Sequence, residues 1–459
     1  MPRVYRADLA FVDGEFLPDC GILVGDDGRI ARVLGPGEET EHPITHFSGR
    51  AILPGFVNAH SHTFQRLIRG RTETRGVGGD DFWSWREPMY RAALSVDADD
   101  VYHVARMTFL EMVMAGTTTV GEFHYLHRAK DGRTYDDPNL LAKKIVAAAE
   151  SVGLRIALLR VAYARAGYEL PPHPGQARFY ESAEEYLANA AALAADLAGS
   201  EQAWLGVAPH SIRAVPLKQF EEIVAWARER DLPVHMHAAE QVGELKACQR
   251  EYGATPVELL AQRELLSAKI TLVHAIHVAD VEMDALAEAK TVICSCPTTE
   301  RNLGDGIIDA AKATERGIRF AFGSDSQAQI DPLEDARELE YHLQLQIQKR
   351  AVLDEIVGQG ISQRLFHYAT AGGAESLGFD GGVLAVGRPA DFFAVDLDDP
   401  SIAGNSAASL LPMVVFGLNR RAITDVVVGG KHTYRDASHP LAAEIVAQYN
   451  EVHRKVWGE

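Results

Sequence analysis

Short apolar segments alternate with helical segments over most of this 459-residue chain. Between residues 53 and 377, strand-like runs such as Arg155 to Val161 and Trp204 to Ala208 are separated by amphipathic stretches such as Ala183 to Leu197. Repeated strand–helix units predict a parallel sheet, and eight of them in this length predict an α/β fold of the TIM-like (β/α)8 barrel type. The first barrel strand is expected at Ala51 to Asn58.

Both ends of the chain have a different pattern, in which short strands are joined by turns. Asp13-Gly14 and Asp27-Gly28 separate strand-like segments near the start, and Gly429-Gly430 marks a turn near the end. Neither set of strands is large enough to form a stable sheet structure alone. We therefore predict that residues 1–52 and 378–440 meet in one small composite β-sandwich domain, beside a barrel of residues 53–377 and followed by a C-terminal helix over 441–459.

The chain is acidic, with 45 Lys and Arg against 64 Asp and Glu and a net charge of −19. This charge argues against nonspecific binding to nucleic acid or to anionic membranes. No apolar stretch reaches the roughly 18 residues of a membrane span, and the first residues lack a signal-peptide core. The four cysteines form neither a zinc-ribbon spacing nor a disulfide framework. We expect a cytoplasmic protein that binds neither nucleic acid nor membranes, and we expect it to be a homodimer.

Two histidines follow the first predicted barrel strand, in Leu-Pro-Gly-Phe-Val-Asn-Ala-His-Ser-His at 53–62. Side chains at positions i and i+2 of a strand point to the same side, so His60 and His62 can face one ion beyond the strand end. Imidazole is a preferred ligand of zinc and related divalent metals. A plain surface pair of histidines is the alternative interpretation.

Three further predicted strands end in groups that can hold or use a metal. They are Pro233 to His237, Thr271 to His274, and Arg319 to Phe322 shortly before Asp325. The carboxyl ends of the strands form the active-site face of a TIM barrel, so these groups are expected to converge. Glu240 follows His237 closely enough to act as a general acid–base on a metal-activated water. Its alternative is a solvated glutamate at a helix start, where the helix dipole favours negative charge.

Together these segments resemble the amidohydrolase superfamily. The matching pieces are residues 53–62, His237-x-x-Glu240, Val273-His274, Gly323-Ser324-Asp325 and Val386-Gly387-Arg388-Pro389-Ala390-Asp391. The resemblance covers nearly the whole chain and implies a barrel flanked by a composite β-domain. Two-metal members of the superfamily carry a bridging carboxylated lysine, and no lysine stands at the middle strand ends here. The chain is thus similar to the mononuclear deaminase branch, which implies one divalent ion, foremost Zn²⁺, bound by His60, His62, His237 and Asp325.

Several other segments are similar to the formimidoylglutamate deiminase family. They are Gln65-Arg66, Phe82 to Arg86, Glu122 to Tyr125, Asp131-Gly132-Arg133, Pro209 to Arg213 and Thr298 to Gly306. This resemblance implies hydrolytic deamination of N-formimino-L-glutamate to N-formyl-L-glutamate and ammonia, a step of histidine degradation. The sequence departs from the pattern at Gln327, where some relatives place a histidine, and at Arg301 and Ile308.

The same resemblance implies a role for each site residue. A substrate with two carboxylates needs fixed donors, and arginine suits bidentate carboxylate recognition. The residues that match the family's substrate contacts are Gln65, Arg86, Tyr125, His210 and Arg213. Glu240 is expected to shuttle the proton, His274 to stabilise the reacting centre, and Asp325 to bind the metal and to handle a proton.

Each substrate contact also has a structural alternative. Arg86 can cover aromatic neighbours at the surface, Tyr125 can be a half-buried strand-end aromatic, and His210 can be a core histidine. Glycines at positions 70, 76, 78 and 79 suggest that the loop over residues 70–82 is a lid that closes over the substrate.

Three other functions remain open from the sequence. The nearest is deamination of a nucleobase or nucleoside, such as guanine or an adenosine derivative, with the same metal site but without paired arginines. The second is hydrolysis of a cyclic amide or carbamoyl bond, commonly with two metals. The third is a binding or assembly protein that keeps the barrel without catalysis.

Overall fold

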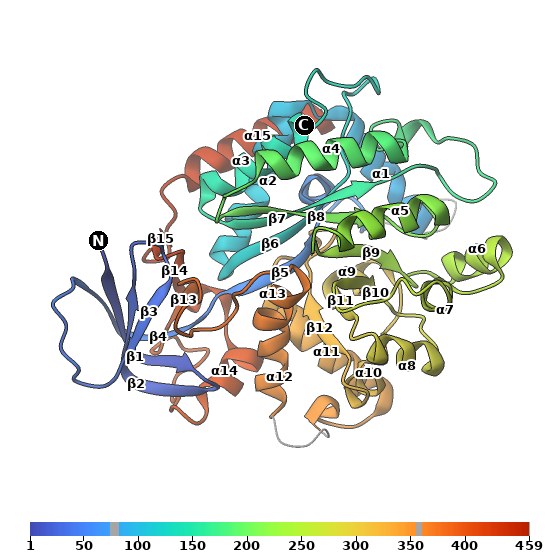
Figure 1. Ribbon diagram of the computed structural model, residues 1–459. Helices are drawn as coiled ribbons and strands as arrows, with labels where there is room; N and C mark the ends of the chain where they lie inside the picture. The colour runs from blue at the N-terminus through green and yellow to red at the C-terminus, as the bar shows by residue number, and fades with distance from the viewer. Residues whose placement is uncertain (74–81, 355–359, 459) are drawn as a thin grey trace.

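The computed structural model describes residues 1–73, 82–354 and 360–458. Eight strands form a parallel sheet in the order β12-β11-β10-β9-β8-β7-β6-β5, surrounded by helices (Figure 1). The strands are β5 (Phe56–Ser61), β6 (Thr117–His124), β7 (Arg155–Ala162), β8 (Ala203–Pro209), β9 (Val234–Ala238), β10 (Ile270–His274), β11 (Val292–Ser295) and β12 (Arg319–Phe322). The predicted TIM-like barrel is confirmed.

The barrel closes at the strand ends that carry the candidate ligands. The amide of His62 donates to the carbonyl oxygen of Asp325 at 3.0 Å, and the amide of Asp325 donates to the carbonyl oxygen of His60 at 3.0 Å. These two bonds join the end of β5 to the segment that follows β12. The backbone itself therefore brings His60, His62 and Asp325 together.

Helices cover the outside of the barrel, and the strands are buried on both faces. Every residue of β6 and β7 is buried, as expected of parallel strands between a filled barrel interior and a helical layer. The larger helices are α1 (Phe82–Ser95), α2 (Ala98–Met114), α3 (Leu140–Val152), α4 (Ala183–Asp196), α5 (Leu217–Arg228), α6 (Val242–Tyr252), α8 (Asp280–Glu288), α11 (Pro332–Ile347), α14 (Leu410–Gly417) and α15 (Ala442–Trp457). Shorter ones are α7 (Pro256–Gln262), α9 (Pro297–Leu303), α10 (Ala310–Glu315), α12 (Ile361–His367) and α13 (Gly373–Ser376).

Strands from both ends of the chain form a second sheet beside the barrel, as predicted (Figure 1). This sheet is mixed and seven-stranded, with the order β15-β14-β13-β4-β1-β2-β3. Its strands are β1 (Arg3–Val12), β2 (Glu15–Val24), β3 (Ile30–Leu34), β4 (Ile44–Pro54), β13 (Phe392–Asp396), β14 (Ile423–Val428) and β15 (Lys431–Tyr434). Tyr5, Phe47 and Phe392 pack against one another in its core.

The predicted first barrel strand, Ala51 to Asn58, is wrong as a single element. Its first half belongs to β4 of the terminal sheet, and its second half belongs to β5 of the barrel. The break falls at Pro54-Gly55, where a Cβ atom on Gly55 would lie 2.3 Å from the side chain of Thr118. Only glycine allows this close approach, so the chain passes from one sheet to the other at this point.

A buried ion pair ties the two sheets together. The Arg155 guanidinium of β7 contacts the Asp391 carboxylate at 2.8 Å, and both side chains are buried. The same carboxylate accepts the amide of Gly429 at 2.6 Å, in the turn between β14 and β15. The late Gly-Arg-Pro-Ala-Asp motif thus fixes the terminal sheet against the barrel.

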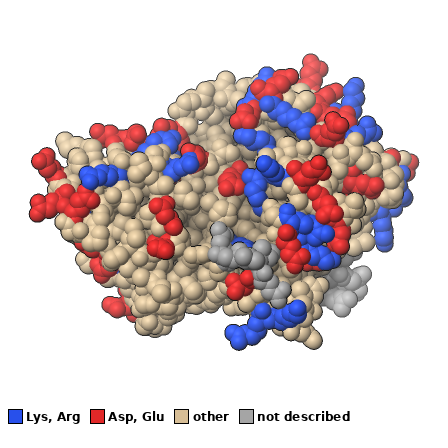
Figure 2. Space-filling model, turned by 60° about the horizontal axis from the view of Figure 1, so that its bottom comes forward, with Lys and Arg blue, Asp and Glu red and all other residues tan. Residues whose placement is uncertain are grey.

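The surface on the side shown in Figure 2 carries acidic and basic side chains close together, with no single large basic area. Among the described residues, no helix combines the length and the apolar character needed to cross a membrane.

Candidate active site

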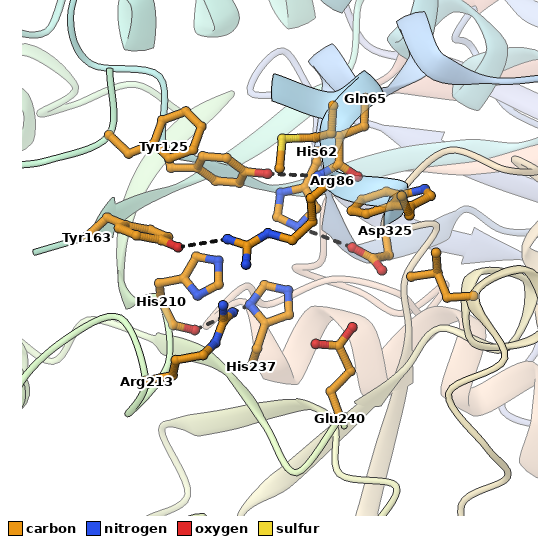
Figure 3. Close-up of a pocket in the computed structure, with 14 residues that line it drawn as sticks. His62, Gln65, Arg86, Tyr125, Tyr163, His210, Arg213, His237, Glu240 and Asp325 are labelled. Carbon is orange, nitrogen blue, oxygen red and sulfur yellow. Dashed lines mark hydrogen bonds and ion pairs between the residues drawn. The ribbon is translucent and has the colours of Figure 1, made fainter. Parts of the chain in front are cut away.

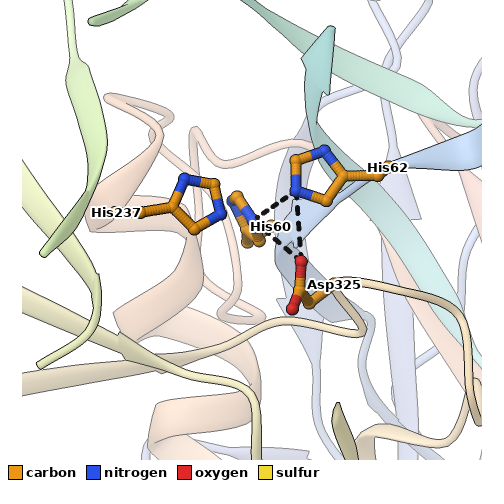
Figure 4. A group of neighbouring side chains, drawn as sticks. All are labelled: His60, His62, His237 and Asp325. Atoms are coloured by element: carbon orange, nitrogen blue, oxygen red, sulfur yellow. Dashed lines mark hydrogen bonds and ion pairs between the residues drawn. The ribbon is translucent and has the colours of Figure 1, made fainter. Parts of the chain in front are cut away.

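Four side chains at the barrel's strand ends form a group that can hold a metal ion (Figure 4). His60, His62, His237 and Asp325 are buried, and their ligand atoms all lie within 4.8 Å of one another. The Nε2 atom of His60 lies 3.3 Å from Asp325 Oδ1, and that of His62 lies 3.1 Å from the same oxygen. Three imidazoles and one carboxylate are a suitable donor set for zinc.

Hydrogen bonds and burial set the orientation and the protonation state of these side chains, so that they can bind a cation. His62 Nδ1 donates to the carbonyl oxygen of Phe123 at 3.0 Å, and His237 Nδ1 donates to that of His210 at 3.3 Å. Each bond leaves the Nε2 lone pair directed at the centre of the group. Burial lowers the pKa of His60 to about 3, so this imidazole is neutral at physiological pH.

The carboxylate of the group is ionised. Burial would raise the pKa of Asp325, but the neighbouring His60 and His62 imidazoles hold it well below its usual range. Neutral imidazoles and a charged carboxylate are the protonation states that metal binding requires. The residues present therefore fit a divalent ion.

Glu240 and His274 lie beside this group. His274 Nε2 lies 3.8 Å from Glu240 Oε1 and 3.8 Å from Asp325 Oδ2. Burial raises the pKa of Glu240, and the nearby His274 opposes that shift. Burial would lower the pKa of His274, but Glu240, Glu300 and Asp325 raise it well above its usual value. The site thus places two groups side by side. One is the Glu240 carboxyl group, whose affinity for protons is raised, and the other is the cationic imidazole of His274.

Glu300, in α9, is a site residue that the sequence reasoning missed. Its carboxylate accepts His274 Nδ1–H at 3.2 Å and the amide of Cys296 at 2.7 Å. The bond to His274 turns Nε2 toward Glu240. In the sequence, residues 298–306 are interpreted only as a segment that resembles the family. Glu300 nevertheless lies just past the end of β11, where a barrel strand points its last side chains into the active site.

A pocket opens in front of the metal group (Figure 3). All five residues predicted to contact the substrate line it, namely Gln65, Arg86, Tyr125, His210 and Arg213. Gln65 donates to the Tyr125 hydroxyl at 2.8 Å, and the His210 ring stacks on His237 with centroids 4.8 Å apart. The structure therefore brings the predicted substrate contacts and the predicted metal ligands into one site.

Other lining residues are not among the predicted substrate contacts. They are Trp85, Met89, Tyr163, Phe179 and Leu303. Arg86 donates to the Tyr163 hydroxyl at 3.5 Å, so this tyrosine holds a predicted substrate contact in place. An isolated aromatic residue looks the same in sequence whether it lines a pocket or fills a core.

Charge is divided across the pocket. In Figure 3 the guanidinium groups of Arg86 and Arg213 lie on one side, and the carboxylates of Glu240 and Asp325 lie on the other. Burial would lower the pKa of Arg213, but Tyr163, Glu244 and Glu240 raise it, so its guanidinium keeps its charge. A ligand with anionic and cationic ends matches this division.

Two expectations from the sequence fall outside the pocket. Gln327 donates to Ser61 Oγ at 2.9 Å and accepts from Ser324 Oγ at 3.0 Å, in a buried network below the metal group. Its departure from the family pattern therefore does not alter the pocket lining among the described residues. The proposed lid over residues 70–82 lies largely outside the described residues, which omit 74–81.

Comparison with known proteins places this architecture in a family. The amidohydrolase family model matches residues 51–433. The chain belongs to the amidohydrolase family. Its chemistry is hydrolysis of carbon–nitrogen bonds, as in its curated relatives.

Formimidoylglutamate deiminase of Pseudomonas aeruginosa is 40% identical over 392 residues, which is 85% of this chain and 86% of the relative. The 5-methylthioadenosine/S-adenosylhomocysteine deaminase of Halobacterium salinarum is 29% identical and covers 87% of this chain and 84% of its own. The crystal structure of an amidohydrolase from Brucella melitensis superposes with a TM-score of 0.91 at 33% identity, covering 99% of this chain and 100% of that one. An adenosine deaminase from Xanthomonas campestris with bound zinc shares the fold, with a TM-score of 0.84 at 22% identity and coverage of 100% and 99%.

Proposed function

We propose that the protein hydrolyses N-formimino-L-glutamate to N-formyl-L-glutamate and ammonia, with one zinc ion. The observation that carries this proposal is the placement of two guanidinium groups, Arg86 and Arg213, opposite the carboxylate of Glu240 in one pocket. The substrate carries a basic formimino group on its α-nitrogen, one carboxylate on the neighbouring α-carbon and a second carboxylate at the end of its side chain. The identity with the Pseudomonas aeruginosa deiminase supports the same substrate.

His60, His62, His237 and Asp325 would hold the zinc ion. When bound, zinc acts as a Lewis acid that makes water a better nucleophile at neutral pH. The protein's own groups perform the remaining steps. Arg86 and Arg213 bind the two carboxylates and hold the formimino carbon in front of the metal group, so that attack becomes effectively intramolecular.

Proton transfer is assigned to Glu240. It accepts a proton from the attacking water and delivers it to the departing nitrogen. The second proton of that water also reaches this nitrogen as the C–N bond breaks, so the nitrogen leaves as ammonia. His274, held by Glu300, donates from Nε2 toward the reacting centre and stabilises charge that develops there. Burial raises the pKa of Glu240, which increases the affinity of its carboxyl group for the proton that it takes from water.

Substitution of Arg213 by Met tests the substrate assignment. Loss of a desolvated charge partner costs about 2–5 kcal/mol, so KM for N-formimino-L-glutamate is expected to rise by about 100-fold or more. Arg301→Met is the matched control, since Arg301 is exposed on α9 and pairs with Glu338. Steady-state ammonia release measures both variants. An unchanged KM in Arg213→Met would remove this residue from the binding site.

A further inference from the structure

A second cavity adjoins the catalytic pocket, and we call it the side chamber. It has a volume of about 170 Å³ and shares three lining residues with the pocket, namely Arg213, His237 and Glu240. In Figure 3 these three side chains lie in the lower part of the view, with His237 between Arg213 and Glu240. The catalytic acid–base therefore borders both spaces.

The side chamber contains a buried carboxylate oxygen that accepts no hydrogen bond from the described residues. Glu244 of α6 is 7% exposed, and its Oε2 atom accepts the amide of Glu240 at 3.1 Å. Its Oε1 atom is buried and has no hydrogen-bond partner among the described residues. A buried carboxylate oxygen without a donor costs free energy, so this position favours a ligand that brings an N–H group.

The rest of the side chamber is less polar. Tyr168 and Ala247 contribute to its wall, and Leu170, which is 59% exposed, lies at its open edge. Arg250 also lines it but is exposed to solvent, and Arg213 faces the substrate's carboxylate in the proposed complex. An acceptor beside apolar side chains suits an amine that carries a short alkyl group.

The size of the side chamber permits such a group. An apolar protein cavity of about 150 Å³ accommodates benzene, so a cavity of about 170 Å³ has room for a short alkyl chain. The departing nitrogen must lie next to Glu240 to receive its proton. A substituent on that nitrogen would then extend past Glu240 toward Glu244.

We propose that the side chamber receives the departing amine, and that the enzyme also hydrolyses formamidines of glutamate whose terminal nitrogen carries a short alkyl group. The substrate class rests on the proposed function. Water adds to the formamidine carbon, the new C–O bond forms, and the bond from that carbon to the alkylated nitrogen breaks. Both protons of that water end on the alkylated nitrogen, one of them carried by Glu240, so the products are N-formyl-L-glutamate and an alkylamine.

The test compares N-formimino-L-glutamate with its N-methyl and N-propyl derivatives as substrates of the complete, zinc-loaded protein. Gly243 lines the side chamber, and a Cβ atom there would meet nothing within 4 Å, so Gly243→Leu adds bulk at this wall with no clash at the Cβ atom. Lys246→Leu is the matched control, because Lys246 is exposed on the same helix and does not line the cavity. We expect wild-type protein and Lys246→Leu to release methylamine and propylamine, and Gly243→Leu to lose at least about tenfold in kcat/KM for the propyl substrate only.

Two results would overturn the side chamber as an amine site. One is turnover of the parent compound without turnover of either alkyl derivative by the wild-type protein. The other is an equal effect of Gly243→Leu on parent and propyl substrates. If the parent compound itself is not hydrolysed, the proposed function fails. Calorimetric titration with propylammonium alone then tests the side chamber as an amine site. We expect propylammonium to bind the wild-type protein but not Gly243→Leu.

Discussion

Replacement of Glu240 by Gln is expected to lower kcat for ammonia release by about 10²- to 10⁴-fold, the usual contribution of a positioned general acid–base. Gln keeps the size of the side chain but cannot carry a proton from water to the departing nitrogen. KM is expected to change little, because Arg86 and Arg213 supply the substrate contacts. The measurement is steady-state kinetics together with the metal content of the purified variant.

Metal content separates catalysis from folding in this experiment. Glu240 is not among the four candidate ligands, so Glu240→Gln should retain the same amount of zinc per chain as the wild-type protein. Near-normal ammonia release by a variant with normal zinc would show that Glu240 is not the proton carrier. Loss of zinc would instead place Glu240 in the metal site.

Substitution of Asp325 by Ala is expected to remove both zinc and activity. Asp325 is the one carboxylate in the group, and its oxygen lies 3.3 Å and 3.1 Å from the Nε2 atoms of His60 and His62. Without this charge, three neutral imidazoles hold a divalent cation much more weakly, and turnover should fall by at least about 10³-fold. Elemental analysis should give one zinc per wild-type chain and little in the variant.

The stability of the protein provides a second measurement of the same site. Zinc that binds only the folded state stabilises it, so added zinc should raise the Tm of metal-stripped wild-type protein and leave that of Asp325→Ala unchanged. Two metals per wild-type chain would contradict a mononuclear centre. Full activity after metal removal would contradict any catalytic metal.

The sequence predicted the metal group well because of topology. In a parallel barrel every strand ends on the same face, so position along the chain translates directly into position in space. His237 and Asp325 are predicted from one criterion, a metal-binding side chain at the end of a strand. The same criterion applies to Glu300, which follows β11 but lies in a segment that otherwise only carries the family resemblance.

The remaining features depend on conformations that sequence patterns do not express. Ala239, His274 and Asp325 have positive φ values of 54°, 72° and 44°, which are uncommon for residues other than glycine. Closely packed surroundings impose these conformations, and such strain gathers at functional sites. They aim the side chains at the strand ends, yet no glycine marks them in the sequence.

The break between β4 and β5 was missed for a similar reason. Residues 51–58 form one apolar run, and the turn at Gly55 is needed only because Thr118 lies against it. Thr118 belongs to a strand that is distant in sequence. A contact of this kind becomes visible only once the two sheets are placed together.

The most direct measurement of the proposed function is a substrate comparison with purified, zinc-loaded protein. Ammonia release is measured from N-formimino-L-glutamate, N-formimino-L-aspartate, guanine and S-adenosylhomocysteine under the same conditions. The two arginines of the pocket should favour N-formimino-L-glutamate over both purine compounds by at least about 10³-fold in kcat/KM. A site built for two carboxylates rejects guanine, which has none, and S-adenosylhomocysteine, which has one. Preferred turnover of guanine or S-adenosylhomocysteine would contradict the assignment.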